Sequence, residues 1–150
     1  MKRIGEMKMK KYKRGITVGV FDLFHVGHLN LLERCKEMCD ELIVAVCDDG
    51  YVRDIKHKEP VVSEGDRVRL LNALKCVDSA VLVNFTETDD KMLLWEKFGF
   101  DVLFSGDDWK GSERYIKTEA AFSKIGVSIE YLPYTQGVST SDLKEKIKNN

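Results

Sequence analysis

The sequence predicts an α/β fold in which a doubly wound parallel sheet of about five strands is flanked by helices in a single domain. Apolar segments of strand length recur along the chain. They are continuous rather than alternating, which is typical of strands covered on both faces. Segments with helical periodicity separate them, and this alternation favours parallel strands joined by right-handed crossovers. With 150 residues and no repeat or linker, the chain has the length of one domain.

The elements of the first half follow in order. The first strand is ITVGVF, residues 16–21, and a helix begins after it near Gly27 or His28. The second strand is ELIVAVC, residues 41–47. Helical spacing of apolar residues supports two helices here. The stripe of the first helix is Leu31, Leu32, Cys35 and Cys39, and that of the second is Val68, Leu71 and Leu74.

The second half repeats the same alternation. The third strand is SAVLV and the fourth is DVLFS, with a helix between them over residues 88–98. A helix over 112–124 leads to the fifth strand, VSIEYL. A last helix over 139–148 starts at Ser139, which forms a capping-box pattern with Asp142. The last three strands therefore cover residues 79–83, 101–105 and 127–132.

Composition favours a globular protein and excludes several classes. The chain is 43% hydrophobic and 33% charged, which argues against disorder. Its longest apolar stretches are far shorter than a membrane span. The basic N-terminus has no apolar region of the kind that secretion requires. We therefore expect a cytoplasmic protein with no membrane partner.

The charge is unevenly distributed. Residues 1–14 hold seven of the 24 Lys and Arg residues but one of the 25 acidic residues, so the remainder carries a charge of −7. We interpret residues 1–14 as a flexible basic arm and residues 15–150 as the folded domain. Such an arm can contact nucleic acid, but a solvated terminus is the favoured interpretation, and the acidic body argues against a nucleic-acid partner.

The four cysteines are expected to be free thiols. Cys35 and Cys39 lie four residues apart on one helix face, with no nearby Cys or His to complete a zinc site. Buried thiols of this kind persist in a reducing compartment. The sequence therefore predicts no metal site on the protein.

The stretch GVFDLFHVGHLNLL places His25 and His28 where the first strand ends and a helix begins. Ligands of parallel sheets bind beyond the carboxyl ends of the strands. The unpaired amides of a helix N-terminus attract phosphate, and Gly27 would let a phosphate approach the backbone. Both imidazoles can donate hydrogen bonds to one phosphate. Two structural histidines are the alternative, and a metal site is disfavoured because no third ligand is evident.

Four blocks of the chain resemble the HxGH nucleotidyltransferases, and within them the glycerol-3-phosphate cytidylyltransferase family. They are GVFDLFHVGHLNLLERCK, IKHKEPVVSEGDRVRLLNAL, FSGDDWKGS and YLPYTQGVSTSDLKEKI, and they lie in family order across residues 16–147. HxGH alone is also found in class I aminoacyl-tRNA synthetases, so the four blocks together carry the resemblance. It implies a Rossmann-like, nucleotide-binding catalytic domain.

The resemblance also implies roles for individual residues. His25, His28, Lys56 and Lys58 would be catalytic, with the lysines on the loop after the second strand neutralising phosphates. Arg67 and Lys56 would bind the acceptor phosphate, since a guanidinium forms a bidentate fork. The nucleotide would contact Val20, Phe21, Asp22, Gly27, Asp107, Trp109, Thr135, Gly137, Val138, Ser139 and Thr140. For Trp109, stacking on the ligand and simple packing stay open, and GDD is also a common turn sequence.

Three positions depart from the family pattern. Tyr134 stands where the family usually has Arg, which removes a cation beside the triphosphate. Val20 replaces a common Thr. Lys75 and Cys76 replace a pair that bears on the acceptor or on a dimer contact. Either another cation compensates for Tyr134 or the substrate differs.

The resulting hypothesis is an enzyme that transfers CMP from CTP to glycerol 3-phosphate, giving CDP-glycerol and pyrophosphate, with Mg²⁺ accompanying CTP. The partners are CTP and a small phosphomonoester, and the family implies a homodimer. Phosphocholine, phosphoethanolamine, another polyol phosphate or a sugar phosphate are alternative acceptors, and ATP is an alternative donor. A non-catalytic nucleotide-binding module and a small RNA-binding protein are the alternatives from other classes.

Overall fold

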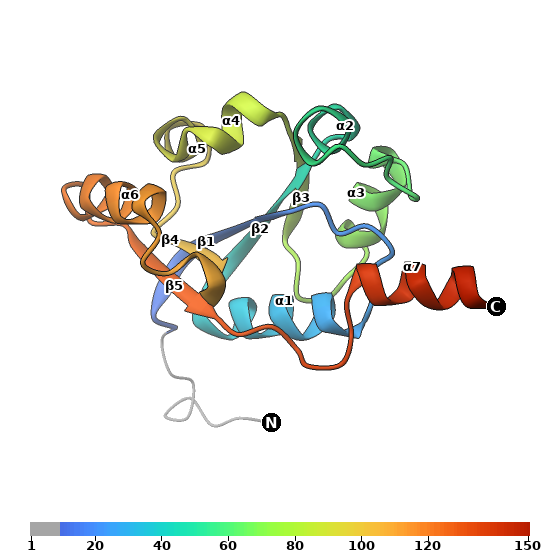
Figure 1. Ribbon diagram of the computed structural model, residues 1–150. Helices are drawn as coiled ribbons and strands as arrows, with labels where there is room; N and C mark the ends of the chain where they lie inside the picture. Colours follow the sequence, from blue (N-terminus) through green and yellow to red (C-terminus); the bar gives the residue numbers. More distant parts are fainter. Residues whose placement is uncertain (1–9) are drawn as a thin grey trace, which may run out of the picture.

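A computed structural model describes residues 10–150 of the protein. Its centre is one five-stranded sheet in the order β3-β2-β1-β4-β5 (Figure 1), and every neighbouring pair of strands is parallel. The predicted fold class is therefore confirmed. The strands are β1 (Tyr12–Gly19), β2 (Cys39–Cys47), β3 (Ser79–Val83), β4 (Val102–Gly106) and β5 (Ser128–Leu132).

Helices cover both faces of this sheet (Figure 1), as right-handed crossovers between parallel strands require. The helices of the first half are α1 (Val26–Met38), α2 (Asp49–Lys56) and α3 (Glu64–Asn72). Those of the second half are α4 (Phe85–Asp89), α5 (Lys91–Phe98), α6 (Glu113–Ser123) and α7 (Thr140–Asn149). A short 3₁₀ turn, η2 (Asp107–Trp109), follows β4.

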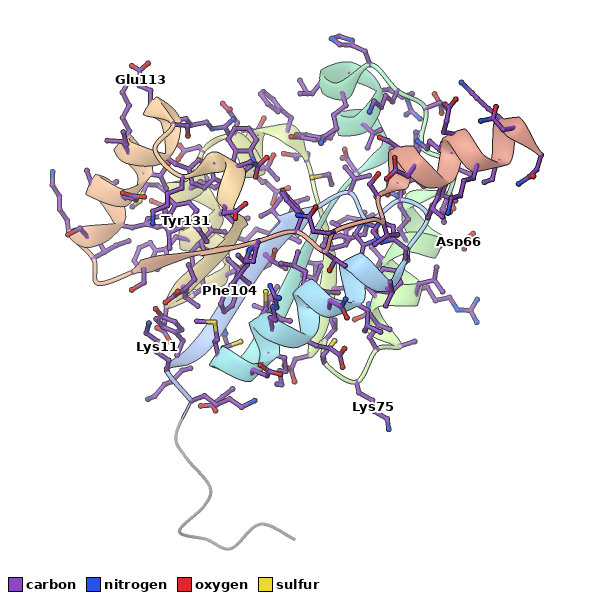
Figure 2. All side chains as sticks on the ribbon, turned by 60° about the horizontal axis from the view of Figure 1, so that its bottom comes forward. Lys11, Asp66, Lys75, Phe104, Glu113 and Tyr131 are labelled. Atoms are coloured by element: carbon purple, nitrogen blue, oxygen red, sulfur yellow. The ribbon has the colours of Figure 1, made fainter. Side chains whose placement is uncertain are left out.

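The sheet separates two apolar cores. One core joins α1 and α3 to the sheet through Leu32, Leu71 and Phe104, and the other joins α5 and α6 through Leu94 and Phe122. Figure 2 shows Phe104 in the interior, whereas Asp66 and Lys75 point away from the molecule. Burial on both sides explains why the strands are continuous apolar runs rather than alternating ones.

The N-terminal boundary differs from the expectation. Strand β1 begins at Tyr12, so residues 12–14 belong to the sheet and not to a flexible arm. Polar contacts hold the start of β1 in place: the Tyr12 hydroxyl donates to Glu130 over 2.5 Å and Arg14 pairs with Glu41 at 3.1 Å. The prediction followed apolar residues and therefore could not include this part of the strand. Of the remaining arm, residues 10 and 11 precede the strand, and residues 1–9 lie outside the described residues.

Two short helices differ from the prediction: α2 was not predicted, and the helix predicted over residues 88–98 is divided into α4 and α5, with α4 beginning earlier. Each begins at a polar capping residue, Asp48 accepting from the amide of Tyr51 over 2.7 Å and Asn84 from that of Glu87 over 3.0 Å. At eight and five residues they are too short to show a periodic stripe. As a consequence Lys56 lies on the last turn of α2, not on a loop as expected.

The cysteines are free thiols, as predicted. Cys35, Cys39 and Cys47 are buried, and Cys76 is partly buried. Burial raises the pKa of both Cys39 and Cys47 to about 11, which keeps these thiols protonated and unreactive. Within residues 10–150, no helix is long and apolar enough to span a membrane.

Candidate active site

Two adjoining cavities lie at the carboxyl ends of the strands. The central cavity, about 260 Å³, is bounded by the ends of β1 and β4 and by side chains from α2, α5 and α6. The α7 cavity, about 220 Å³, is bounded by the segment after β1 and by the start of α7. Val20, Phe21, His28 and Lys56 line both cavities. His28 and Lys56 are therefore the polar side chains at the junction.

The backbone between β1 and α1 is strained. Phe21 and Leu23 have φ angles of 56° and 49°, in the left-handed region that non-glycine residues rarely adopt. Such positions cost on the order of 1–3 kcal/mol each and persist where the surroundings hold them. Asp22, between them, supplies that hold: its carboxylate accepts from the amides of Val61 and Val62, each over 2.9 Å. The strained turn is thus fastened to the segment before α3.

Asp22 also ties this turn to the last helix. Lys144 lies 3.4 Å from its carboxylate, and the Thr140 hydroxyl donates to its carbonyl over 2.8 Å. Burial opposes ionisation of Asp22, yet the two amides and Lys144 together lower its pKa, so the side chain is a carboxylate at neutral pH. Asp22, predicted to contact the nucleotide, lines the α7 cavity and also joins three segments around the junction.

Asp22→Asn should loosen this organisation. The Asn side chain has one oxygen and one NH₂ group where the Asp side chain has two oxygens. The NH₂ group cannot accept a hydrogen bond, so the backbone N–H of either Val61 or Val62 loses its acceptor. We expect the free energy of unfolding to fall by about 1–3 kcal/mol. Hydrogen exchange of the Val61 and Val62 amides should accelerate. Asp54→Asn, at an exposed position of α2, is the control and should change neither. Unchanged exchange at Val61 and Val62 would contradict this role.

The two histidines are held in one tautomer by the backbone. His25 precedes the first residue of α1, and its Nδ1 accepts from the amide of Gly27 over 3.0 Å. His28 Nδ1 accepts from the amide of His25 over 3.2 Å. The rings stack with their centroids 3.8 Å apart. A neutral imidazole that accepts at Nδ1 carries its proton on Nε2, so each ring offers one Nε2–H donor.

Both rings are neutral at physiological pH. Burial and, to a smaller extent, the neighbouring His25 lower the pKa of His28 to about 4, although Asp22 partly opposes the shift. Burial also lowers the pKa of His25. The predicted hydrogen-bonding role of neutral imidazoles therefore has the required protonation state.

This depressed pKa has a measurable consequence for stability. The unfolded chain protonates His28 near pH 6.5, but the folded protein does so only near pH 4. The unfolded chain therefore binds this proton more readily than the folded protein does. As a result, the free energy of unfolding decreases as the pH falls from 6.5 to 4. We expect the His28 ring to titrate near pH 4 by NMR. The Tm of wild type should fall more steeply between pH 6.5 and 4 than that of His28→Gln, and equal slopes would contradict the assignment.

Gly27 lies where the protein leaves no room for a side chain. A Cβ at this position would lie 2.9 Å from the His25 ring and 3.1 Å from Cγ1 of Val138. The space that a side chain at Gly27 would need is thus filled by the capping imidazole and by Val138 from the segment before α7. The glycine allows the His25 ring and Val138 to lie against the start of α1.

The start of α7 faces the α7 cavity. Ser139 caps the helix as predicted, its hydroxyl accepting from the amide of Asp142 over 3.0 Å. Thr140, Ser141 and Lys144 line the cavity with Lys58. The first amides of a helix have no partner within it, so this end favours an anion. Lys144 was not predicted, although its position four residues after Thr140 on the same helix face could have indicated it.

Arg67 is a correction. We expected it to bind the acceptor phosphate, but it is 1% exposed and its donors are occupied inside the protein. The guanidinium donates to the carbonyls of Val62, Val20 and Cys47 over 2.8–2.9 Å and to the Asp49 carboxylate over 2.5 Å. It links the ends of β1 and β2 to α3 and is not available to a ligand.

Aromatic side chains from the segments after β4 and β5 border the central cavity. Trp109 is 44% exposed, stacks on Tyr115 with centroids 5.5 Å apart and lines the central cavity. Tyr134 also lines it, and its hydroxyl occupies the space that a Cβ at Gly106 would need, 2.2 Å from that position. Burial and the neighbouring Asp108 raise the pKa of Tyr134 to about 12. Trp109 therefore packs on one ring and also borders the cavity.

Other predicted site residues lie beside the cavities without lining them. They are His25, Gly27, Asp107, Thr135, Gly137, Val138 and Ser139. Thr135 lies near α1, where the Asn30 amide donates to its hydroxyl over 3.3 Å. The central cavity also has lining residues that sequence reasoning missed, namely Tyr51, Thr88, Lys91, Arg114 and Tyr115. They follow β2, β3 and β4, so the strand-end rule alone would have indicated their region.

Comparison with known proteins gives consistent results. Residues 16–146 match the model of a family described as cytidylyltransferase-like. The chain is 35% identical to glycerol-3-phosphate cytidylyltransferase of Staphylococcus aureus, over 90% of this chain and 95% of that protein. It is 38% identical to FAD synthase of Thermococcus onnurineus, over 86% and 85% of the two chains. A lipopolysaccharide core biosynthesis protein from Thermoplasma volcanium superposes with a TM-score of 0.66 at 30% identity, covering 83% and 97%.

Proposed function

The chain belongs to the cytidylyltransferase-like family and is a nucleotidyltransferase, and from this premise we propose that it transfers CMP from CTP to glycerol 3-phosphate. The products are CDP-glycerol and pyrophosphate. The observation that carries the proposal is the position of His28 and Lys56 at the junction of two cavities, one of which is bounded by a helix N-terminus and lysines. Similarity to glycerol-3-phosphate cytidylyltransferases of two bacteria, at 35% and 34% identity, supports the acceptor.

The reaction is an in-line displacement at phosphorus. An oxygen of the acceptor phosphate forms a bond to the α-phosphorus of CTP, and the bond to the α–β bridging oxygen breaks, so that pyrophosphate leaves with the electron pair. No covalent step on the protein is needed, so catalysis depends on positioning and on stabilising the developing charge. The Nε2–H of His28, which lines both cavities, donates to an oxygen of the phosphoryl group at the junction, and that of His25, stacked on His28 beside the cavities, would donate to the same group.

Cations and amides of the α7 cavity would hold the rest of the triphosphate. Lys58 and Lys144 line it together with the start of α7. Two like charges 4 Å apart repel by about 4 kcal/mol at an effective dielectric of 20, so bringing CTP and a phosphomonoester together requires such neutralisation. Lys144, which also lies 3.4 Å from the Asp22 carboxylate, supplies the kind of cation that Tyr134 lacks. This supports a triphosphate site despite the departure at position 134.

Mg²⁺ would enter with the nucleotide. Within residues 10–150, no three His, Cys, Asp or Glu side chains are grouped so that they could hold a metal ion. Mg²⁺ suits this arrangement, because it keeps several waters and binds phosphate oxygens with few protein ligands. Bound to the triphosphate, it would neutralise charge on the leaving group, while the histidines and lysines hold the phosphates in place.

The donor has one supported alternative. The 38% identity to an FAD synthase favours a second candidate, adenylyl transfer from ATP to a phosphomonoester, with the same roles for the junction residues. Trp109 and Tyr134 offer aromatic surfaces suited to either base.

One experiment separates these candidates. The protein is incubated with Mg²⁺ and each nucleoside triphosphate against a panel of phosphomonoesters, and pyrophosphate release is followed. We expect release with CTP and sn-glycerol 3-phosphate, and none when EDTA replaces Mg²⁺. Activity with ATP alone would favour adenylyl transfer, the second candidate, over CMP transfer from CTP. No activity with any pair would overturn the proposal.

We further propose a cytoplasmic homodimer. Buried free thiols suit a reducing compartment. Strand β3 is an edge of the sheet, and its Leu82 is 37% exposed, which leaves the segment of residues 75–83 open to a second copy. Light scattering on the purified protein tests this, and a monomer at micromolar concentration would contradict it.

A further inference from the structure

Two cations that the proposed mechanism does not use form a wall of the central cavity. Lys91, the first residue of α5, and Arg114, near the start of α6, line both the central cavity and a third cavity of about 760 Å³ between α5 and α6. Lys91 is partly buried, and its amine donates to the carbonyl of Thr88. Arg114 pairs with Asp89 at 3.0 Å. The Lys91 amine therefore has a fixed position with donors left over.

The charge of the central cavity is one-sided. In the part of the chain that the structure describes, its lining residues include Lys56, Lys91 and Arg114 but no aspartate or glutamate. Asp89, which pairs with Arg114, lines only the third cavity. Burial, followed by the repulsion of Arg114, lowers the pKa of Lys91 to about 8, and Asp89 opposes this shift only in part. A positively charged ligand placed here would meet Lys56 and Lys91, together with Arg114, whose charge Asp89 offsets in part.

The reaction geometry assigns the part of the central cavity near Lys91 to the acceptor. This assignment rests on the proposed function. In an in-line displacement, the nucleophile enters opposite the leaving group. The leaving pyrophosphate is assigned to the α7 cavity. Figure 1 shows α7 on one side of the carboxyl ends of β1 and β2, and α4 and α5 on the other side. With the nucleoside beside Trp109 and Tyr134, the region near Tyr51, Thr88 and Lys91 remains for the acceptor.

We propose that Lys91 is a specificity-determining residue for the acceptor. Its ammonium donates a hydrogen bond to an oxygen in the part of the acceptor remote from the phosphate and, with Arg114, repels a cationic head group. The enzyme therefore accepts phosphomonoesters with neutral or anionic tails and rejects phosphocholine and phosphoethanolamine. Juxtaposed like charges impose a strong penalty on the wrong partner.

The test measures kcat/KM for sn-glycerol 3-phosphate and for phosphocholine in wild type and in Lys91→Met, which keeps an apolar stem of similar length. We expect wild type to prefer glycerol 3-phosphate by at least ~100-fold. In Lys91→Met, this ratio should fall at least ~10-fold, through a lower value for glycerol 3-phosphate, while KM for CTP changes less than about threefold. Lys91→Arg keeps the charge and should keep the rejection of phosphocholine.

Lys97→Met, at an exposed position of the same helix that lines none of the three cavities, is the matched control and should leave the ratio unchanged. Arg114→Gln removes the second cation, at a half-exposed side chain, and should also lower the ratio. This variant provides the test if Lys91→Met does not fold. A wild type that prefers phosphocholine, or a ratio unchanged in both Lys91→Met and Arg114→Gln, overturns the inference while nucleotidyl transfer stands. No activity with any acceptor overturns the proposed function instead.

Discussion

His28→Ala should lower kcat by at least ~100-fold, the scale of losing one donor aimed at a developing oxyanion. His28 is the histidine that lines both cavities, and its Nε2–H is free because Nδ1 accepts from the backbone of His25. A neutral donor in a partly desolvated site needs no reorganisation as charge develops on the phosphoryl oxygens. The loss should appear in kcat more than in KM for CTP, because the triphosphate keeps its other contacts.

Two further variants separate catalysis from capping. The amide of His28→Asn can accept from the His25 amide as Nδ1 does, but it places nothing where Nε2 lies. It should be as inactive as alanine while its Tm stays nearer to wild type. The longer His28→Gln places a donor near the Nε2 position and should recover part of the activity. Near-full activity in His28→Asn would show that this imidazole is only a helix cap.

The control for imidazole loss is His57, the third histidine. It is exposed, lines neither cavity of the site and has a φ of 54° after the end of α2. Asn tolerates this left-handed conformation, so His57→Asn removes a ring without straining the backbone. It should retain wild-type turnover within about twofold. A comparable loss in His57→Asn would mean that activity responds to any change in this region, and the comparison with His28 would lose its meaning.

Local patterns predicted the parts of the protein that local physics determines. The apolar runs located all five strands, because burial on both faces requires continuous apolar sequence. The pair His25 and His28 was located at the carboxyl end of β1 because a strand-to-helix junction can be read from the sequence. Ser139 was recognised as a cap for the same reason. Each of these features depends on residues that are close together in the sequence.

Features that depend on distant segments could not be predicted. Arg67 is a helical arginine in the sequence, and nothing nearby shows that the carbonyls of Val20 and Cys47 converge on it. Lys91 and Arg114 reach the central cavity only because α5 and α6 lie beside the strand ends. The reason for Gly27 also required the fold, since Val138 is 111 positions away along the sequence but packs beside it.

The corrected role of Arg67 leads to the largest expected effect on stability. Arg67→Met keeps most of the side-chain volume but removes the guanidinium that four acceptors share. Three carbonyls and the Asp49 carboxylate, whose side chain is 19% exposed, then lose their donors in a buried site. Breaking a buried pair from one side costs about 3–5 kcal/mol, and we expect a loss of this size in the free energy of unfolding from urea denaturation.

Two substitutions test whether the effect belongs to this network. Arg69→Met changes an exposed arginine on the same helix and should shift the free energy of unfolding by less than about 0.5 kcal/mol. Arg67→Lys keeps a positive charge but cannot donate to all four acceptors, so its stability should lie between wild type and Arg67→Met. For folded protein, KM for the acceptor should change little in either Arg67 variant. If Arg67→Met instead unfolds like wild type and raises that KM, the guanidinium reaches the acceptor phosphate in solution, and the burial seen in the structure does not describe the working enzyme.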